Sequence, residues 1–231
     1  MTSGSAVSGS ALCLALALLV AGCSPAASDG SAQPELEPDG AYTLRSERHL
    51  LHELDPRPKL GSVFALIEIP SGSNGKWEVG KDDGHLHLER RGGAPRVVDY
   101  LAYPANYGMI PQTLLPKQLG GDGDPLDVLV LGPAAARGAL LRVELIGVLR
   151  LLDGGEQDDK LLAVQPGAPL GEIRELAELD QRYPGVRQIV ELWFTNYKGP
   201  GVMEPQGFGD RETAIRILNA ALREYRESRK G

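Results

Sequence analysis

Three carboxylates fall within six residues of one short stretch, at Asp122, Asp124 and Asp127. Glycine and proline between them are incompatible with a helix, and the apolar run Val128–Leu131 follows at once, so the sequence predicts a turn that enters a buried strand. Residues two apart in an extended chain share a face, which lets Asp122 and Asp124 converge, and a bend after Pro125 would bring Asp127 to the same point. Carboxylates this close repel one another unless a cation lies between them, so the stretch is a candidate site for Mg²⁺, Mn²⁺ or Ca²⁺.

Two other interpretations apply to this acidic stretch. Asp-Gly-Asp-Pro is also ordinary turn chemistry, because aspartate caps its own backbone and glycine supplies a positive φ. A calcium-binding EF-hand loop fits poorly. Such a loop needs a glycine at its sixth position and a glutamate at its twelfth, and counting from Asp122 these places hold Asp127 and Pro133.

The composition is that of an ordinary globular protein of one domain. The chain has 231 residues, of which 42% are hydrophobic and 24% are charged. Its formal net charge is −7 and its sequence pI is about 5.2. No block of lysine and arginine is present to neutralise a phosphate backbone, which argues against a nucleic-acid partner. An anionic ligand must therefore be met by a few placed cations or by metal ions.

An apolar run from Ala11 to Gly22 ends at Cys23. Twelve residues are too few to span a bilayer but suit the core of a signal peptide, and Val-Ala-Gly-Cys resembles the box at which bacterial lipoproteins are cleaved and lipidated. We expect a signal peptide over residues 1–22, a flexible tether over 23–41 and one domain over 42–231. The protein would lie in the cell envelope and touch the membrane only through lipid on Cys23. No lysine or arginine precedes Arg45, so a buried N-terminal helix and a cytoplasmic location remain alternatives.

The rest of the chain predicts an α+β fold. Several short, alternating or apolar runs indicate strands before residue 165, and three helices are expected over 170–182, over 184–197 and after a cap at Asp210. Many strands followed by helices favour a small barrel. Glu68 is unusual because it interrupts the apolar strand that ends at Pro70. Burying its carboxylate would cost several kcal/mol unless it is paired or bound to metal.

Taken together, the motifs resemble those of the soluble inorganic pyrophosphatases of the first family. They occur in the family's order between about Phe64 and Asp210: Ile67-Glu68-Ile69-Pro70, Lys76-Trp77-Glu78, Glu89-Arg90, Tyr103-Pro-Ala-Asn-Tyr107-Gly108, Asp122-Gly-Asp124-Pro-Leu-Asp127-Val, Asp153 with Asp158-Asp159-Lys160, and Tyr197-Lys198. The resemblance implies an OB-like five-stranded β-barrel with flanking C-terminal helices. It also implies hydrolysis of pyrophosphate to two phosphates with several Mg²⁺ ions per site, for which Mn²⁺ or Zn²⁺ could substitute. We further expect a homo-oligomer.

The resemblance also assigns a role to each matched residue. Metal ligands would be Glu68, Asp122, Asp127, Asp153 and Asp158. Asp124 would accept the proton of the attacking water, and Tyr107 would form a hydrogen bond near it. Phosphate oxygens would be bound by Lys76, Arg90, Lys160, Tyr197 and Lys198, while Glu78 and Tyr103 would line the cavity.

One departure from the family concerns the segment after Lys198. Bacterial members carry a further lysine there, whereas here no lysine occurs between Lys198 and Lys230. The missing lysine would affect the affinity for phosphate more than the hydrolysis reaction. Two alternatives to a pyrophosphatase are a catalytically silent envelope lipoprotein that binds phosphate or divalent metal, and a hydrolase of wider phosphoanhydride range. No Walker-type loop supports a nucleotide site.

Overall fold

The computed structural model describes residues 1, 32–57, 62–121 and 123–230. Residues 2–22 of the predicted signal peptide, residues 23–31 of the predicted tether including Cys23, and Asp122 lie outside these residues. Within the described ranges, no helix combines the length and the apolar character needed to cross a bilayer.

Five strands close into a barrel in the described part of the chain. They are β3 (Val63–Ile69), β8 (Asn106–Met109), β9 (Asp127–Leu131), β10 (Leu140–Asp153) and β12 (Lys160–Val164). The order is β10-β12-β9-β8-β3, and β3 pairs back onto the first residues of β10. Only the β9–β12 pair is parallel. The predicted α+β fold with a five-stranded barrel is confirmed.

A glycine permits the close contact between β3 and β8. A Cβ atom on Gly108 would lie 1.9 Å from the carbonyl oxygen of Leu66, so no larger residue fits there. The two strands can therefore approach closely enough to bring Tyr107, next to Gly108, opposite Ile69 and close to Glu68.

The remaining strands flank the barrel. The strands β11 (Glu156–Gln157) and β13 (Met203–Gly209) both pair with β10. A second sheet has the order β1-β2-β5-β4, formed by Leu36–Pro38, Thr43–Ser46, Leu86–Leu88 and Trp77–Val79. A hairpin joins β6 (Arg90–Arg91) to β7 (Ala94–Pro95), and a single 3₁₀ turn, Lys117–Leu119, precedes the acidic stretch.

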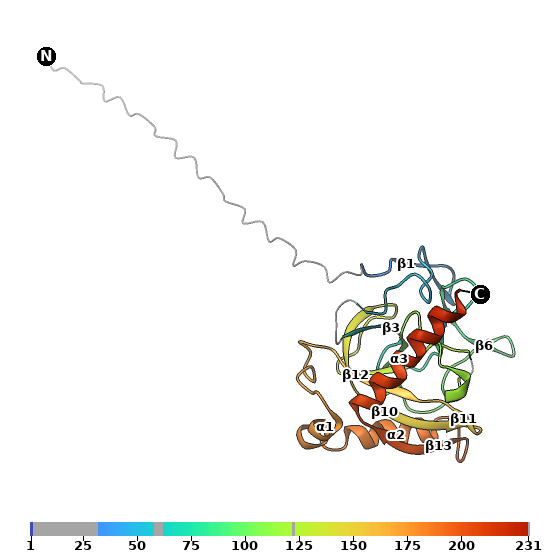
Figure 1. Ribbon diagram of the computed structural model, residues 1–231. Coiled ribbons are helices and arrows are strands. Elements are labelled where there is room, and N and C mark those ends of the chain that lie inside the picture. Colours follow the sequence, from blue (N-terminus) through green and yellow to red (C-terminus); the bar gives the residue numbers. More distant parts are fainter. Residues whose placement is uncertain (2–31, 58–61, 122, 231) are drawn as a thin grey trace.

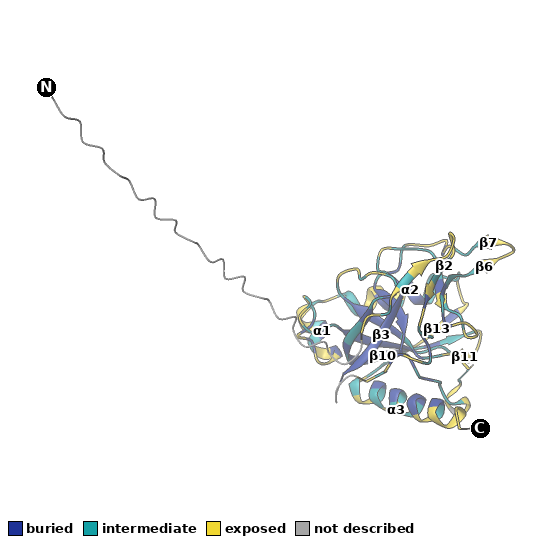
Figure 2. Cartoon of the chain, turned by 90° about the horizontal axis from the view of Figure 1, so that it is seen from above, coloured by how far each residue is buried: buried dark blue, intermediate teal, exposed yellow. Residues whose placement is uncertain are grey.

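Helices cover the barrel (Figure 1). The longest, α3 (Arg211–Ser228), starts at the predicted cap, where the Asp210 carboxylate accepts a hydrogen bond from the Thr213 amide at 2.8 Å. Its buried face includes Ala214, Leu218 and Ala221 and packs on barrel residues, while its outer face is exposed (Figure 2). The helices α1 (Leu176–Arg182) and α2 (Val186–Asn196) pack on the other part of the core.

The predicted helix over 170–182 is wrong in its first half, since α1 begins at Leu176. Hydrogen-bonded turns occupy the preceding residues, with the Gly171 amide bound to the Ala168 carbonyl at 2.8 Å. A Cβ atom on Gly171 would lie 2.4 Å from the Gln165 carbonyl oxygen, so a turn too tight for other residues replaces the expected helical turns.

The folded part also begins earlier than the predicted boundary at residue 42. The Gln33 side chain donates to the Leu140 carbonyl at 2.7 Å and accepts from the Leu140 amide at 2.8 Å. Beyond it, Leu36–Pro38 pairs with β2. The C-terminal end of the predicted tether is therefore part of the fold.

Candidate active site

The site is built where β9 and β12 lie side by side. Their parallel register places Lys160 opposite Asp127, the first residue of β9, and Asp158 precedes Lys160 by two residues. The Lys160 ammonium donates to an Asp127 oxygen at 2.5 Å and also contacts the Asp158 carboxylate. Its side chain is only 2% exposed, so the charge is held almost entirely by these two carboxylates.

The electrostatics of Lys160 follow from this arrangement. Burial disfavours its charged form, but the carboxylates of Asp127 and Asp158 outweigh that effect and raise the pKa of Lys160 above its usual value. The ammonium is therefore a fixed positive charge in the wall of the site at any physiological pH.

Glu68 lies on β3, buried as the sequence indicated. Its Oε1 atom accepts a hydrogen bond from the Val79 amide at 2.8 Å. Burial raises the pKa of Glu68 to about 8, although nearby Lys76 opposes the shift. Near neutral pH its carboxyl is mostly protonated, and a cation brought beside it would favour the ionised form.

Aromatic rings form the rear of the site. Tyr107 is buried, and the Lys76 ammonium lies 4.9 Å from the centre of its ring. Tyr103 packs edge-on to Tyr107 at 5.6 Å and also contacts Trp193 at 4.4 Å, so it belongs to the aromatic cluster behind the cavity wall and is not one of the residues that line it. Burial raises the pKa values of Tyr103, Tyr107 and Tyr197 above the usual range, so all three remain neutral phenols.

A cavity of about 520 Å³ joins these elements. Its described charged and phenolic lining comprises Glu68, Lys76, Glu78, Lys81, Arg96, Tyr107, Asp124, Asp127, Asp153, Asp158, Asp159, Lys160, Tyr197 and Lys198. Of the predicted site residues within the described ranges, only Arg90 and Tyr103 are not part of this lining.

The Arg90 prediction is wrong in position. Gly92 and Gly93, both at positive φ, turn the chain into the β6–β7 hairpin, which carries Arg90 away from the cavity. There the Arg90 Nε donates to the Gly93 carbonyl at 3.1 Å, and the guanidinium lies 5.1 Å from the centre of the Tyr42 ring.

Arg96, which the sequence interpretation missed, takes the place expected for Arg90. It follows the hairpin, and its backbone carbonyl accepts a hydrogen bond from the Lys76 amide at 2.9 Å. Its guanidinium pairs with Glu89, with 2.5 Å between Nη1 and Oε2. The Gly-Gly pair after Arg90-Arg91 was the available signal, because it predicts a hairpin whose returning strand leads to a second arginine.

Lysines pair with two other acidic groups of the cavity. Lys198 contacts Asp153, and Lys81, which the sequence interpretation did not assign, contacts Asp124. The Asp124–Lys81 pair is half exposed, unlike the Asp127–Lys160 pair. Asp124 and Asp127 line the same cavity but each contacts a different lysine.

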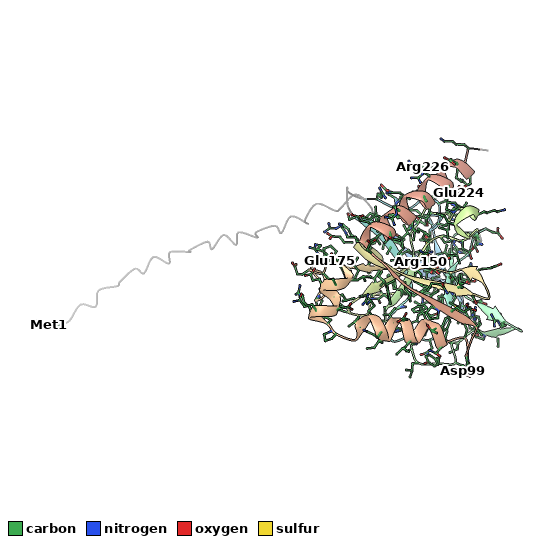
Figure 3. All side chains as sticks on the ribbon, turned by 60° about the horizontal axis from the view of Figure 1, so that its bottom comes forward. Met1, Asp99, Arg150, Glu175, Glu224 and Arg226 are labelled. Atoms are coloured by element: carbon green, nitrogen blue, oxygen red, sulfur yellow. The ribbon has the colours of Figure 1, made fainter. Side chains whose placement is uncertain are left out.

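A further carboxylate, Asp159, is used for support. Its oxygens accept hydrogen bonds from the Leu151 amide at 3.2 Å and the Gln157 side chain at 2.5 Å. Arg150, labelled on the central strands in Figure 3, lies 2.8 Å from it. Burial raises the pKa of Asp159. These contacts brace the turn that carries Asp158.

The donor set of the cavity fits hard divalent cations. Seven carboxyl groups and five cationic side chains line it within the described residues, which leaves an excess of oxygen ligands of the kind that Mg²⁺ prefers. No three carboxylate or imidazole groups of the described chain are gathered as a metal cluster, because the lysines lie between the acids. Metal ligation by Asp127, Asp153 and Asp158 would thus compete with these lysine contacts, and Glu68 would be a further ligand.

Comparisons of the sequence with protein families and with individual known proteins point to the same family. The family described as inorganic pyrophosphatase matches residues 65–226. The inorganic pyrophosphatase of Campylobacter jejuni subsp. jejuni is 36% identical over 182 residues, which are 71% of this chain and 92% of that protein.

Solved structures agree with the sequence comparisons. The inorganic pyrophosphatase of Helicobacter pylori is similar with a TM-score of 0.64 at 30% identity, covering 75% of this chain and 99% of that one. A truncated vacuolar soluble pyrophosphatase of Trypanosoma cruzi, in complex with PPi, has a TM-score of 0.77 at 19% identity, covering 86% and 91%. At that identity the second likeness bears on the fold alone.

The buried Lys160 leads to a prediction about stability. Lys160→Met should lower the free energy of unfolding of the metal-free protein by about 3 kcal/mol, the lower end for breaking a buried pair, because Asp127 and Asp158 keep about a quarter of their exposure. Added Mg²⁺ should stabilise this variant more than the wild type, since a cation can replace the ammonium. Urea unfolding with EDTA and with Mg²⁺ measures both effects.

Lys81→Met is the matched control. Its ion pair with Asp124 is exposed, so the loss should stay below about 1 kcal/mol. Equal losses in the two variants, or no extra gain of the Lys160 variant from Mg²⁺, would contradict this account of the buried charge.

Proposed function

Because the chain belongs to the inorganic pyrophosphatase family and hydrolyses inorganic pyrophosphate to two phosphates, we propose that the charged cavity between the barrel and β4 is its active site. The observation that carries the proposal is the meeting, in one cavity, of excess carboxylates with several fixed cations. Pyrophosphate carries about three negative charges at neutral pH, and a purely acidic cavity would repel it.

Mg²⁺ is the proposed metal. Glu68, Asp122, Asp127, Asp153 and Asp158 would hold the ions, with Mn²⁺ or Zn²⁺ as substitutes. Bound there, divalent cations would supply charge neutralisation and a lowered pKa for the attacking water. Asp122 lies outside the described residues, so its part in this set rests on the sequence.

The chain's own cations would hold the substrate. Lys76, Arg96, Lys160 and Lys198 all reach the cavity and can donate to phosphate oxygens, and the guanidinium of Arg96 can donate two parallel hydrogen bonds. The neutral phenol of Tyr197 is a further donor. This set needs no lysine in the segment after Lys198, where β13 instead pairs with β10.

Asp124 is the proposed general base. It is the most exposed of the cavity aspartates with a described ion pair, and its partner Lys81 is itself exposed, so both can move as the site fills. After Lys81 leaves, the Asp124 carboxylate can accept a proton from water. The buried Tyr107 phenol, which remains protonated, can donate a hydrogen bond toward the reacting oxygens.

Phosphate release from pyrophosphate tests the proposal. The purified chain should produce two phosphates per pyrophosphate with Mg²⁺ and almost none with EDTA. Tripolyphosphate and ATP, assayed in parallel, measure whether other phosphoanhydrides are accepted. A chain that binds phosphate and Mg²⁺ but releases no product would instead support the catalytically silent alternative.

Matched variants test whether Arg96, and not Arg90, binds the substrate. Arg96→Lys keeps the charge but loses the paired donors, so kcat/KM for pyrophosphate should fall about ten- to a hundredfold, corresponding to about 1.5–3 kcal/mol for a charge-assisted bond. Arg90→Lys, in the neighbouring hairpin, should leave kcat/KM unchanged. The reverse outcome would return Arg90 to the site.

We also propose the envelope location expected from the sequence. Its support is the Val-Ala-Gly-Cys box after a short apolar run. Cys23→Ser should abolish incorporation of labelled fatty acid and leave the full-length chain unprocessed. Wild-type protein found wholly in the cytosol, with residues 1–22 retained, would contradict the proposal.

Self-association stays a prediction. Apolar side chains of Ile189 and Leu192 on α2 are more than half exposed, as is Leu101. They would suit contact between copies of the chain. Sedimentation velocity of the purified protein measures the oligomeric state, and a monomer at micromolar concentration would exclude it.

A further inference from the structure

The active-site groups come from two separately hydrogen-bonded sheets. Glu68, Asp127 and Lys160 belong to the barrel, whereas Lys76 and Glu78 lie at β4, an edge of the second sheet. In the described chain, no strand of the barrel pairs with a strand of that sheet. Apart from the short connection over 70–76 and its main-chain hydrogen bonds, such as that from the Lys76 amide to the Arg96 carbonyl at 2.9 Å, the relative position of the two groups depends on side chains.

One hydrogen bond between the two sheets involves a side chain that is also a proposed metal ligand. The Glu68 carboxylate accepts the Val79 amide at 2.8 Å, which links β3 to β4. Glu68 is also a proposed metal ligand, and lone pairs engaged by a cation are less available to that amide. A link made only by this hydrogen bond would therefore weaken when metal ions and substrate bind.

Arg137 forms a second tie that uses no chemical group of the site. Its Nε donates to the backbone carbonyl of Glu68 at 3.0 Å, and its guanidinium lies 4.3 Å from the centre of the Trp77 ring on β4. One side chain thus contacts both sheets, through a main-chain hydrogen bond on the barrel side and a cation–π contact on the other.

The segment that carries Arg137 is fixed to the barrel. The Gly138 amide donates to the Ile67 carbonyl at 2.6 Å, and the Ile67 amide donates to the Ala139 carbonyl at 2.9 Å. Both bonds are made by Ile67, the residue before Glu68. The backbone at Arg137 is therefore held against β3. The guanidinium thus links this fixed segment to the Trp77 ring, and Trp77 lies between Lys76 and Glu78 in the sequence.

We propose that Arg137 is a positioning residue, which keeps Lys76 at a fixed distance from Glu68 when the site holds its substrate. The inference rests on the proposed function. It assigns Arg137 no contact with pyrophosphate, since Arg137 does not line the cavity. Its loss should weaken the binding of substrate in the ground state and the transition state alike, and so raise KM more than it lowers kcat.

The test is steady-state kinetics of Arg137→Ala at saturating Mg²⁺. KM for pyrophosphate should rise about tenfold, the size expected for one hydrogen bond and one cation–π contact, while kcat changes less than about threefold. Arg211→Ala is the matched control, because the Arg211 Nε also donates to a backbone carbonyl, that of Leu145 at 3.1 Å, away from the cavity lining. Its KM should equal that of the wild type.

A spectroscopic readout is independent of activity. The chain has two tryptophans, so a Trp193→Phe background leaves Trp77 as the only one. In metal-free protein, acrylamide quenching of Trp77 should increase at least twofold when Arg137→Ala is added, and not when Arg211→Ala is added. Arg137→Lys keeps a cation near the ring without the Nε donor, and should give intermediate values of KM and quenching.

The outcomes separate this inference from the proposed function. A folded Arg137→Ala with unchanged KM, or with kcat lowered as much as kcat/KM, overturns the positioning role. If Arg137→Ala does not fold, Arg137→Lys decides in the same way. A wild-type chain without pyrophosphatase activity contradicts the proposed function instead. The positioning role is then decided by Trp77 quenching and by calorimetric binding of imidodiphosphate, which should be weaker for Arg137→Ala than for Arg211→Ala.

Discussion

The burial of one lysine between two carboxylates is the constraint on which the rest of the site depends. An ammonium group in a barrel wall is destabilising unless it is fully paired. The parallel β9–β12 register supplies Asp127 directly opposite Lys160, and the turn before β12 supplies Asp158. A shift of one residue in that register would leave a buried charge without its partner. Closure of the barrel and assembly of the charged cavity are therefore the same structural event.

The other features of the cavity follow from its surplus of acid. Divalent cations held by these carboxylates would leave the lysines beside them available to donate to phosphate oxygens, so we expect substrate and metal ions to bind together. Glu68 fits this exchange, because burial holds its pKa at about 8 and keeps it nearly neutral until a cation arrives. The half-exposed Asp124–Lys81 pair is the one most easily separated. Most of the carboxylate charge is thus balanced within the site before loading, which reconciles seven carboxyl groups with a folded core.

The sequence predicted those parts that local chemistry determines. The turn before Asp127 and the buried strand after it follow from glycine, proline and apolar runs, and the Asp210 cap marks the start of α3 correctly. Other parts depend on distant contacts. The strand β13, which contains a proline at position 205, was not predicted because its pairing with β10 stabilises it and its own pattern does not. Arg90 and Arg96 are equivalent in type, and only the geometry of the intervening hairpin decides which one reaches the cavity.

The central claim about the site is that Asp124 acts as the base and Asp127 as a metal ligand, and this division of roles can be tested directly. The measurement is kcat of Asp124→Asn and Asp127→Asn over a full Mg²⁺ titration. A lost ligand weakens metal binding, so Asp127→Asn should need more Mg²⁺ and recover in part at high concentration. A lost base cannot be replaced by metal, so Asp124→Asn should stay about 10²–10⁴-fold slower at saturating Mg²⁺ with a smaller change in the midpoint. Full recovery of Asp124→Asn at high Mg²⁺, with no recovery of Asp127→Asn, would contradict the assignment.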